Sequence, residues 1–176
     1  MCCDSDLAEQ KTRCYGQLAG RALKGVLLVL EPRIRPLALC IFHHHGKILV
    51  NPFYDAVEKR SLFRPVGGGI EFGERSIDAI VREVHEELGL SISNVRLIGT
   101  LESIFTYAGK RGHEIVQVYD ARFEDAAVYE RPWLDGVESD GSPFKATWHS
   151  ASSFTDASAL VPEGLSELLR KACLLD

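Results

Sequence analysis

Three carboxylates that lie close together in the sequence offer the clearest chemistry in this chain. Glu83, Glu86 and Glu87 stand at positions i, i+3 and i+4, a spacing that stacks side chains on one face of a helix. Like charges at this spacing oppose helix formation by roughly 0.2–0.5 kcal/mol per pair. A divalent cation with oxygen ligands would offset that repulsion. A solvated acidic face is the commoner explanation of such a cluster, and the glutamates alone favour it.

The residues around the cluster argue for the metal. Gly67, Gly68 and Gly69 stand upstream, and Arg82 directly precedes Glu83; a merely solvated face requires no glycine run at a fixed spacing. From Gly68 to Leu90 the chain has Gly, five residues, Glu, seven residues, Arg-Glu, an aliphatic residue, any residue, Glu-Glu, any residue, Gly and an aliphatic residue. Seven fixed residues at about one in fifteen each make a chance match rare.

This arrangement resembles the signature box of the Nudix hydrolases at every defined position. The segment from Arg64 to Gly68 is similar to the family's Pro-Gly-Gly lead-in, except that Pro65 comes one place early and Val66 takes its usual position. The resemblance implies metal-dependent hydrolysis of a phosphoanhydride bond in a nucleoside diphosphate linked to another moiety. It also implies an α/β fold, an α/β/α sandwich with a mixed β-sheet between helices.

The resemblance also implies roles for single residues. Glu83 would take the proton from the attacking water, and Glu74 would hold Arg82 so that the arginine braces the glycine loop against the helix. The metal would be Mg²⁺, with Mn²⁺ as a substitute. Its ligands would be the backbone carbonyl of Gly67 and the carboxylates of Glu83, Glu86 and Glu87.

A helix must position these glutamates. The spacing predicts that it follows Ser76 as N-cap and ends at Gly89, which can adopt the left-handed conformation. Its buried face would hold five apolar residues, namely Ile77, Ile80, Val81, Val84 and Leu88.

The rest of the chain predicts one domain, residues 31–176, preceded by an extension of uncertain structure, residues 1–30. His43, His44 and His45 would alternate faces in a strand, so they predict a hairpin tip and not a metal site. Pro52 should end the pairing of the hairpin, and residues 54–61 and 124–144 should be polar loops. The expected strands are 34–43, 47–50, 62–66, 95–107, 113–123 and 145–149, and the expected last helix is 163–174.

The candidate substrate-binding residues lie outside the box. Tyr107 lies close to where diadenosine-polyphosphate members of the family often carry a tyrosine, and Phe105 stands where ADP-ribose members often carry proline. This favours a dinucleoside polyphosphate or a nucleoside triphosphate, although either aromatic ring would also suit a core. Glu114 suits a further metal ligand and an outward charge equally. Other candidate substrate contacts are Arg64 and the turn residues Lys110 and Arg111, for which solvation is the simpler explanation.

Three other functions compete with this one. A non-catalytic nucleotide-binding regulator on the same fold would usually have lost box glutamates, which this chain keeps. An ADP-ribose or sugar-nucleotide pyrophosphatase shares the box. Trimming of an RNA 5′-triphosphate end is disfavoured by the lack of a basic stripe.

Composition sets the remaining expectations. The net charge of −5 over 176 residues gives no general attraction for nucleic acid or an anionic membrane, so we expect a small nucleotide as partner. The five cysteines lack metal-type spacing and fit reduced thiols. No apolar run approaches the ~18 residues of a membrane span, and we expect a cytoplasmic protein, with a homodimer left open.

Overall fold

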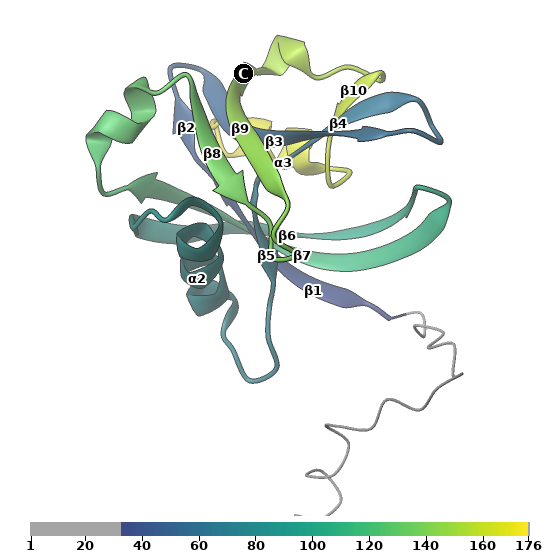
Figure 1. Cartoon of the computed structure of the whole chain (residues 1–176), viewed down its shortest axis with the longest axis horizontal. Helices are drawn as coiled ribbons and strands as arrows, with labels where there is room; N and C mark the ends of the chain where they lie inside the picture. Colours follow the sequence, from purple (N-terminus) through teal and green to yellow (C-terminus); the bar gives the residue numbers. More distant parts are fainter. Residues whose placement is uncertain (1–32, 176) are drawn as a thin grey trace, which may run out of the picture. The chain divides into compact units, whose positions relative to one another are not determined.

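The computed structural model describes residues 33–175, so the extension expected at residues 1–30 lies outside the described residues. In the described part of the chain strands dominate, and they are joined by two α-helices and two short 3₁₀ turns (Figure 1). In chain order the elements are β1 (Arg35–Ile41), β2 (His43–His44), β3 (Lys47–Asp55), β4 (Arg60–Arg64), β5 (Val66–Gly69), α2 (Ser76–Leu88), β6 (Ile92–Tyr107), β7 (Lys110–Phe123), η1 (Ala126–Glu130), β8 (Trp133–Val137), β9 (Pro143–Ser150), η2 (Ala151–Ser153), β10 (Ser158–Leu160) and α3 (Leu165–Lys171).

The strands form two sheets. One has four strands in the order β5-β1-β7-β6, and the other runs β10-β4-β3-β9-β8, with β2 paired to β3. The pairs β1–β7 and β10–β4 are parallel and the others are antiparallel, so the strand pairing is mixed, as expected. The sequence did not predict the division into two sheets.

Strand β1 is buried on both faces. Ala38 and Cys40 belong to a core cluster that includes Ile80 and Val84 of α2. Leu37, Leu39 and Ile41 belong to a second cluster that includes Leu165 and Leu169 of α3. Because successive side chains of a strand point to opposite faces, β1 lies between the two helices. This confirms the α/β fold with sheet between helices.

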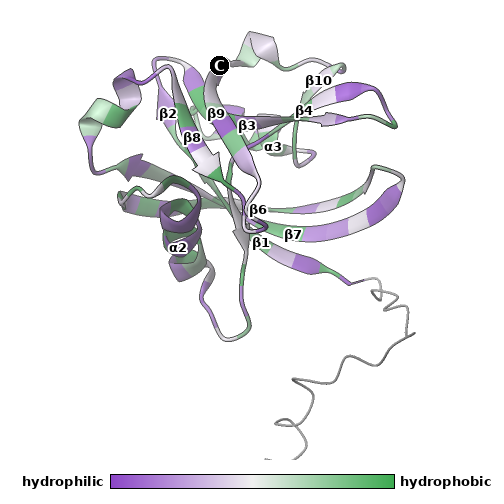
Figure 2. Cartoon of the chain, in the orientation of Figure 1, coloured by the Kyte–Doolittle hydropathy of each residue, from purple (hydrophilic) through white to green (hydrophobic). Residues whose placement is uncertain are grey.

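Helix α2 has the length that the box predicts. It ends at Gly89, whose φ of 66° is left-handed. The N-cap is Arg75 and not Ser76, because the Ser76 hydroxyl bonds the Tyr119 hydroxyl at 2.6 Å and does not cap the helix. Val81 is exposed, contrary to expectation, because it points away from the sheet. Hydrophilic residues cover much of α2 in Figure 2.

The pairing of β3 corrects the prediction for Pro52. Residues Lys47 to Val50 pair with β9, and residues Asn51 to Asp55 pair with β4. The strand therefore changes partner between Val50 and Asn51, and it continues through Pro52. The turn at His45 and Gly46, both with positive φ, is the hairpin tip that the sequence predicts.

Other boundaries also differ from the sequence predictions. The region 124–144 was predicted to be a polar loop from its composition, but it contains η1 and strand β8. Lys110 and Arg111 lie in β7 and not in a turn, because Ala108 and Gly109 alone reverse the chain. Helix α3 is shorter than 163–174, since Gly164 is its N-cap. Among the residues that the structure describes, no helix is long and apolar enough to span a membrane.

Candidate active site

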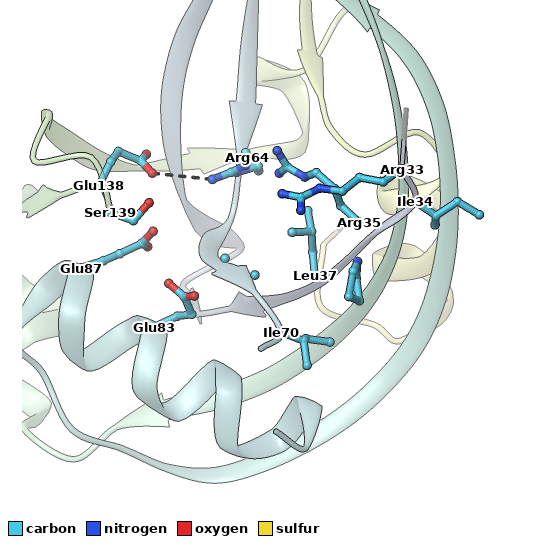
Figure 3. Close-up of a pocket in the computed structure, with 13 residues that line it drawn as sticks. Arg33, Ile34, Arg35, Leu37, Arg64, Ile70, Glu83, Glu87, Glu138 and Ser139 are labelled. Atoms are coloured by element: carbon cyan, nitrogen blue, oxygen red, sulfur yellow. Dashed lines mark ion pairs between the residues drawn. The ribbon is translucent and has the colours of Figure 1, made fainter. Parts of the chain in front are cut away.

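Helix α2 presents two carboxylates to a cavity of about 550 Å³. Glu83 and Glu87 line it, and each is only 7% exposed. In Figure 3 both carboxylates point from the helix toward Arg33, Arg35 and Arg64 on the opposite side. Carboxylates can hold a hard cation, and guanidinium groups bind phosphate oxygens. One side of the cavity is therefore suited to a metal ion, and the opposite side is suited to a phosphate group.

The glycine loop approaches α2 so closely that side chains are excluded. The Gly67 N–H donates to Glu87 Oε2 at 3.1 Å, and the φ of Gly67 is 130°, in the region that favours glycine. A Cβ on Gly68 would lie 2.6 Å from the Glu83 carboxylate. Glycine at positions 67 and 68 is therefore a packing requirement of this site.

Arg82 connects the helix to the loop. Its Nε and Nη2 donate to the two oxygens of Glu74 at 2.8 and 2.9 Å, a bidentate pair. Nη2 also donates to the Gly69 carbonyl at 2.9 Å, and Nη1 donates to Glu83 Oε1 at 2.9 Å. The hydrogen bonds from Arg82 lower the pKa of Glu74 to about 2, and the same bonds raise the pKa of Arg82. These are the contacts that the resemblance implied for Arg82 and Glu74.

Glu86 differs from Glu83 and Glu87 in its exposure. Its side chain is 56% exposed and accepts from Arg82 Nη1 at 3.0 Å, and it does not line the cavity. Its assignment as a metal ligand stays a prediction. Since Glu83 and Glu87 are four residues apart, the buried pair comes from successive turns of one helix face.

Glu87 has the most unusual electrostatics of the site. The pKa of Glu87 is raised to about 7, mainly by burial and also by the charges of Glu138 and Glu83, while the hydrogen bond from Gly67 and the charge of Arg64 act to lower it. Burial removes water from the charged form, and the Gly67 N–H and the Arg64 guanidinium replace that water only in part. The side chain is thus a buried acid whose charge the protein does not fully compensate.

Four polar residues that line this cavity were missed by the sequence predictions. Arg33 and Arg35 stand two apart where β1 begins, a spacing that places both on one side of an extended chain. Glu138 accepts from Asn51 Nδ2 at 2.8 Å and lies 3.8 Å from Arg64 Nη2. Ser139 follows it. The spacing of Arg33 and Arg35 could have predicted that both arginines lie on one side of the chain. Glu138 lies in a segment that was predicted to be a polar loop, so nothing in the sequence indicated its place in the site.

The candidate substrate residues divide between two locations. Tyr107 and Phe105 line a second cavity of about 810 Å³, and Arg64 lines both cavities. Lys110 and Arg111 are exposed and line neither, so their substrate role stays a prediction. Glu114 lines the second cavity, where its Oε1 lies 3.1 Å from Arg35 Nη2. Glu114 therefore lines the second cavity and not the first, and its role as a metal ligand stays a prediction.

Residues 33–175 contain no group of three or more His, Cys, Asp or Glu side chains arranged to hold a metal ion. The predicted ligand from Gly67 is a backbone carbonyl, which is not among such groups of side chains. A cation at this site would consequently rely on few protein ligands and complete its shell with water or substrate, which is usual for Mg²⁺.

The sequence model of the NUDIX domain matches residues 35–170. The chain belongs to the Nudix family. The match covers the glycine loop, α2 and all residues that line the two cavities except Arg33 and Ile34. Family membership agrees with the resemblance of residues 68–90 to the Nudix box.

Curated relatives and solved structures extend this result. The chain is 28% identical over 137 residues to the NAD-capped RNA hydrolases NudC of Mycobacterium tuberculosis and Mycobacterium bovis, covering 77% of this chain and 42% of each relative. It thus spans less than half the length of these relatives. A MutT NUDIX hydrolase from Burkholderia pseudomallei has a similar fold, with a TM-score of 0.55 at 19% identity over 78% of this chain and 97% of that one. The E. coli ORF135 protein gives a TM-score of 0.54 at 21% identity over 82% and 96% of the two chains.

Proposed function

We propose that this Nudix protein hydrolyses a phosphoanhydride bond in a nucleoside diphosphate linked to another moiety, and that the reaction depends on a divalent metal. The observation that carries the proposal is the first cavity, in which Glu83 and Glu87 face Arg33, Arg35 and Arg64. A pyrophosphate needs both kinds of partner, a cation beside its oxygens and donors that fix its orientation. The cavity supplies donors directly and carboxylates for the cation.

The residues present fit a hard divalent cation. Glu83 and Glu87 offer buried oxygen ligands, and burial raises the pKa of Glu87 in spite of the opposing charge of Arg64, as expected of a carboxylate that a cation would stabilise. We assign Glu83, Glu87 and the Gly67 carbonyl as ligands, keep Glu86 and Glu114 as the outer candidates, and favour Mg²⁺ with Mn²⁺ as its substitute. When bound, the cation supplies charge neutralisation on the phosphates.

The chain's own groups would prepare the reaction. Glu83 accepts a proton from water as the water oxygen bonds to phosphorus, and the bridging P–O bond breaks with its electron pair leaving on the departing phosphate. Arg82 fixes Glu83 Oε1 at 2.9 Å, so that the other oxygen remains available to the cavity. Glu74 holds Arg82 by two bonds, and the pair therefore acts by positioning Glu83.

Within this substrate class we infer a dinucleotide-like molecule, a dinucleoside polyphosphate in preference to a nucleoside triphosphate. Tyr107 and Phe105 line a second cavity beside the first, which offers room for a group beyond one pyrophosphate. The relatives named NAD-capped RNA hydrolase support this inference, since NAD is itself two nucleosides joined through a pyrophosphate. The net charge of −5 favours small substrates over bulk nucleic acid.

A substrate panel tests the proposal. Dinucleoside polyphosphates, NAD, ADP-ribose, sugar nucleotides and nucleoside triphosphates are incubated with the protein at saturating Mg²⁺, and released phosphate and nucleotide products are quantified. We expect metal-dependent cleavage of at least one nucleoside diphosphate derivative, and loss of that cleavage in the Glu83→Gln variant. The variant controls for contaminating hydrolases.

The opposite result has a clear meaning. If the folded protein binds these nucleotides but cleaves none of them with Mg²⁺ or Mn²⁺, it is the nucleotide-binding regulator considered above. If Glu83→Gln cleaves as fast as the natural chain, the chemistry does not use this helix.

A further inference from the structure

The second cavity opens between the two sheets and adjoins the first. Its volume of about 810 Å³ lies within the roughly 300–1,000 Å³ of small-molecule sites. Arg35 and Arg64 line both cavities. A ligand whose phosphates lie beside these arginines would therefore extend into the second cavity with the remainder of the molecule.

Strand register explains which side chains form the walls. In the β3–β4 ladder Phe53 lies opposite Leu62, and Asp55 opposite Arg60. Opposite residues in an antiparallel pair share a face, so Phe53, Leu62 and Arg60 all face the other sheet. From that sheet β6 contributes Phe105 and Tyr107, which are two residues apart and share a face for the same reason. Figure 1 shows the β6–β7 hairpin facing β3, β4 and β10.

Two aromatic rings meet across the cavity. The centroids of Phe53 and Tyr107 are 5.6 Å apart and their planes are at 77°, an edge-to-face contact. Phe53 belongs to one sheet and Tyr107 to the other, so this contact bridges the sheets. Tyr107 remains 38% exposed. A partly exposed ring in a cavity wall offers a surface on which a planar base can stack.

Arg60 is an uncommitted hydrogen-bond donor in the same cavity. Its Nε is buried without a hydrogen-bond partner, and within residues 33–175 it forms no ion pair. Arg35 is paired with Glu114 and Arg64 with Glu138. Asp55, the ladder partner of Arg60, accepts with Oδ1 from the amides of Val57 and Glu58 at 2.9 and 3.2 Å, and its Oδ2 is likewise buried without forming a hydrogen bond, to Arg60 or to any other described residue. Because a buried donor without an acceptor is costly, Arg60 suits a ligand atom that accepts.

The charged residues that line the second cavity indicate which kind of chemical group it can bind. Three arginines line it together with three acidic residues, Glu114, Asp156 and Glu163. The acidic side chains offset the cations, and a phosphate chain would meet carboxylates as well as guanidinium groups. The other lining residues are mostly apolar, among them Leu39, Leu62, Leu160 and Pro162. An uncharged, planar group with acceptor atoms on its edge fits this lining better than a polyanion does.

We propose that the second cavity binds a nucleobase of the substrate, that Phe53 and Tyr107 contact its ring, and that Arg60 donates to an acceptor on its edge and sets base specificity. The inference rests on the proposed function, because the pyrophosphate in the first cavity directs the base into the second. It adds Phe53 and Arg60 as substrate-binding residues.

Steady-state kinetics on four symmetrical dinucleoside tetraphosphates, which differ only in the base, test the assignment. The variants are Phe53→Ala, Tyr107→Ala and Arg60→Met. Tyr54→Ala and Arg170→Met are matched controls, because Tyr54 is exposed on the opposite face of β3 and Arg170 is exposed on α3. Melting temperatures are measured on every variant.

Each aromatic substitution should raise KM roughly tenfold to hundredfold with little change in kcat, as for the loss of one stacked base. Arg60→Met should raise KM for the preferred base most and flatten the differences among the four bases. The two control variants should retain the natural KM. An unchanged KM in Phe53→Ala, with or without a large fall in melting temperature, would overturn the assignment.

A phosphate chain in the second cavity would give a different pattern. Arg60→Met would then raise KM equally for all four bases, and inorganic triphosphate would compete as well as the nucleotides. That outcome rejects a base in the second cavity.

Failure of the proposed function can be distinguished from failure of this inference. If the natural chain hydrolyses none of the four compounds, calorimetric binding of the four nucleoside 5′-monophosphates to the metal-free protein still tests the cavity. Weaker binding by Phe53→Ala and Arg60→Met, with Tyr54→Ala unchanged, supports the base site. Equal binding by all variants overturns it.

Discussion

Replacing Glu87 by Gln should stabilise the metal-free protein, and the gain should depend on pH. The folded chain raises the pKa of Glu87 to about 7, mainly through burial, against an ordinary value of 4.5. Below pH 4.5 the carboxyl group is protonated in both the folded and the unfolded chain, so it contributes no difference. Between pH 4.5 and 7 the unfolded chain ionises first, and the folded state loses stability as pH rises. Above pH 7 the full cost is present.

The difference between the two pKa values gives the size of the effect. It corresponds to about 1 kcal/mol at pH 5.5 and about 3 kcal/mol at pH 8. The glutamine removes the ionisable group but keeps an oxygen that can accept from the Gly67 N–H. Glu87→Gln should therefore match the natural chain at pH 4 and exceed its free energy of unfolding by up to about 3 kcal/mol at pH 8.

Urea denaturation in EDTA at pH 4, 5.5 and 8 measures this gain. Glu86→Gln is the matched control, because Glu86 is on the same helix but its side chain is 56% exposed, and its loss should change stability by less than about 1 kcal/mol at every pH. A gain for Glu87→Gln that is the same at pH 4 and pH 8 would refute the reasoning. Saturating Mg²⁺ should stabilise the natural chain more than the variant, since the cation supplies the missing positive charge.

Three further predictions concern the site itself. Glu83→Gln should lower kcat by roughly 100-fold or more with the circular dichroism spectrum unchanged, and activity within a few-fold of the natural chain would exclude Glu83 as the base. Excess EDTA should stop hydrolysis and added Mg²⁺ or Mn²⁺ should restore it; hydrolysis that persists in EDTA would contradict a metal mechanism. Gly68→Ala should impair activity and cost about 1–3 kcal/mol of stability, because its Cβ would lie 2.6 Å from the Glu83 carboxylate. In Gly69→Ala the Cβ meets nothing within 4 Å, so equal losses in both variants would show that the Gly68 contact is not the cause.

The Nudix box allowed the sequence to predict α2 and the groups around it. Local spacing determines these features, since one helix face holds Glu83 and Glu87 and a left-handed Gly89 ends the helix. The contact of Arg82 with Glu74 also lies within the box and was predictable by resemblance. The sequence could not show that Glu86 stays exposed outside the cavity, where it shares the Nη1 donor of Arg82 with Glu83.

The rest of the site depends on contacts between distant segments. Glu138 reaches the cavity only because β8 pairs with β9 and Asn51 binds its carboxylate, and neither event has a local signal. Phe53 contacts Tyr107, and Arg60 lines the same cavity, between two sheets that the sequence predictions did not separate. Residues 54–61 were predicted to be polar loop, whereas the hairpin between β3 and β4 continues to Asp55 and Arg60. Strand pairing over long separations is thus the information that a single sequence lacked.

The change of partner along β3 has a consequence for self-association. Beyond Val50, strand β9 no longer covers the side of β3 that faces away from β4. An uncovered strand edge can recruit a strand from another molecule. Pro52 lies on this stretch and lacks an N–H, so it removes one donor from the exposed edge and discourages such pairing. A non-proline residue at position 52 would restore that donor, and its expected effect is lower solubility of the folded protein at high concentration.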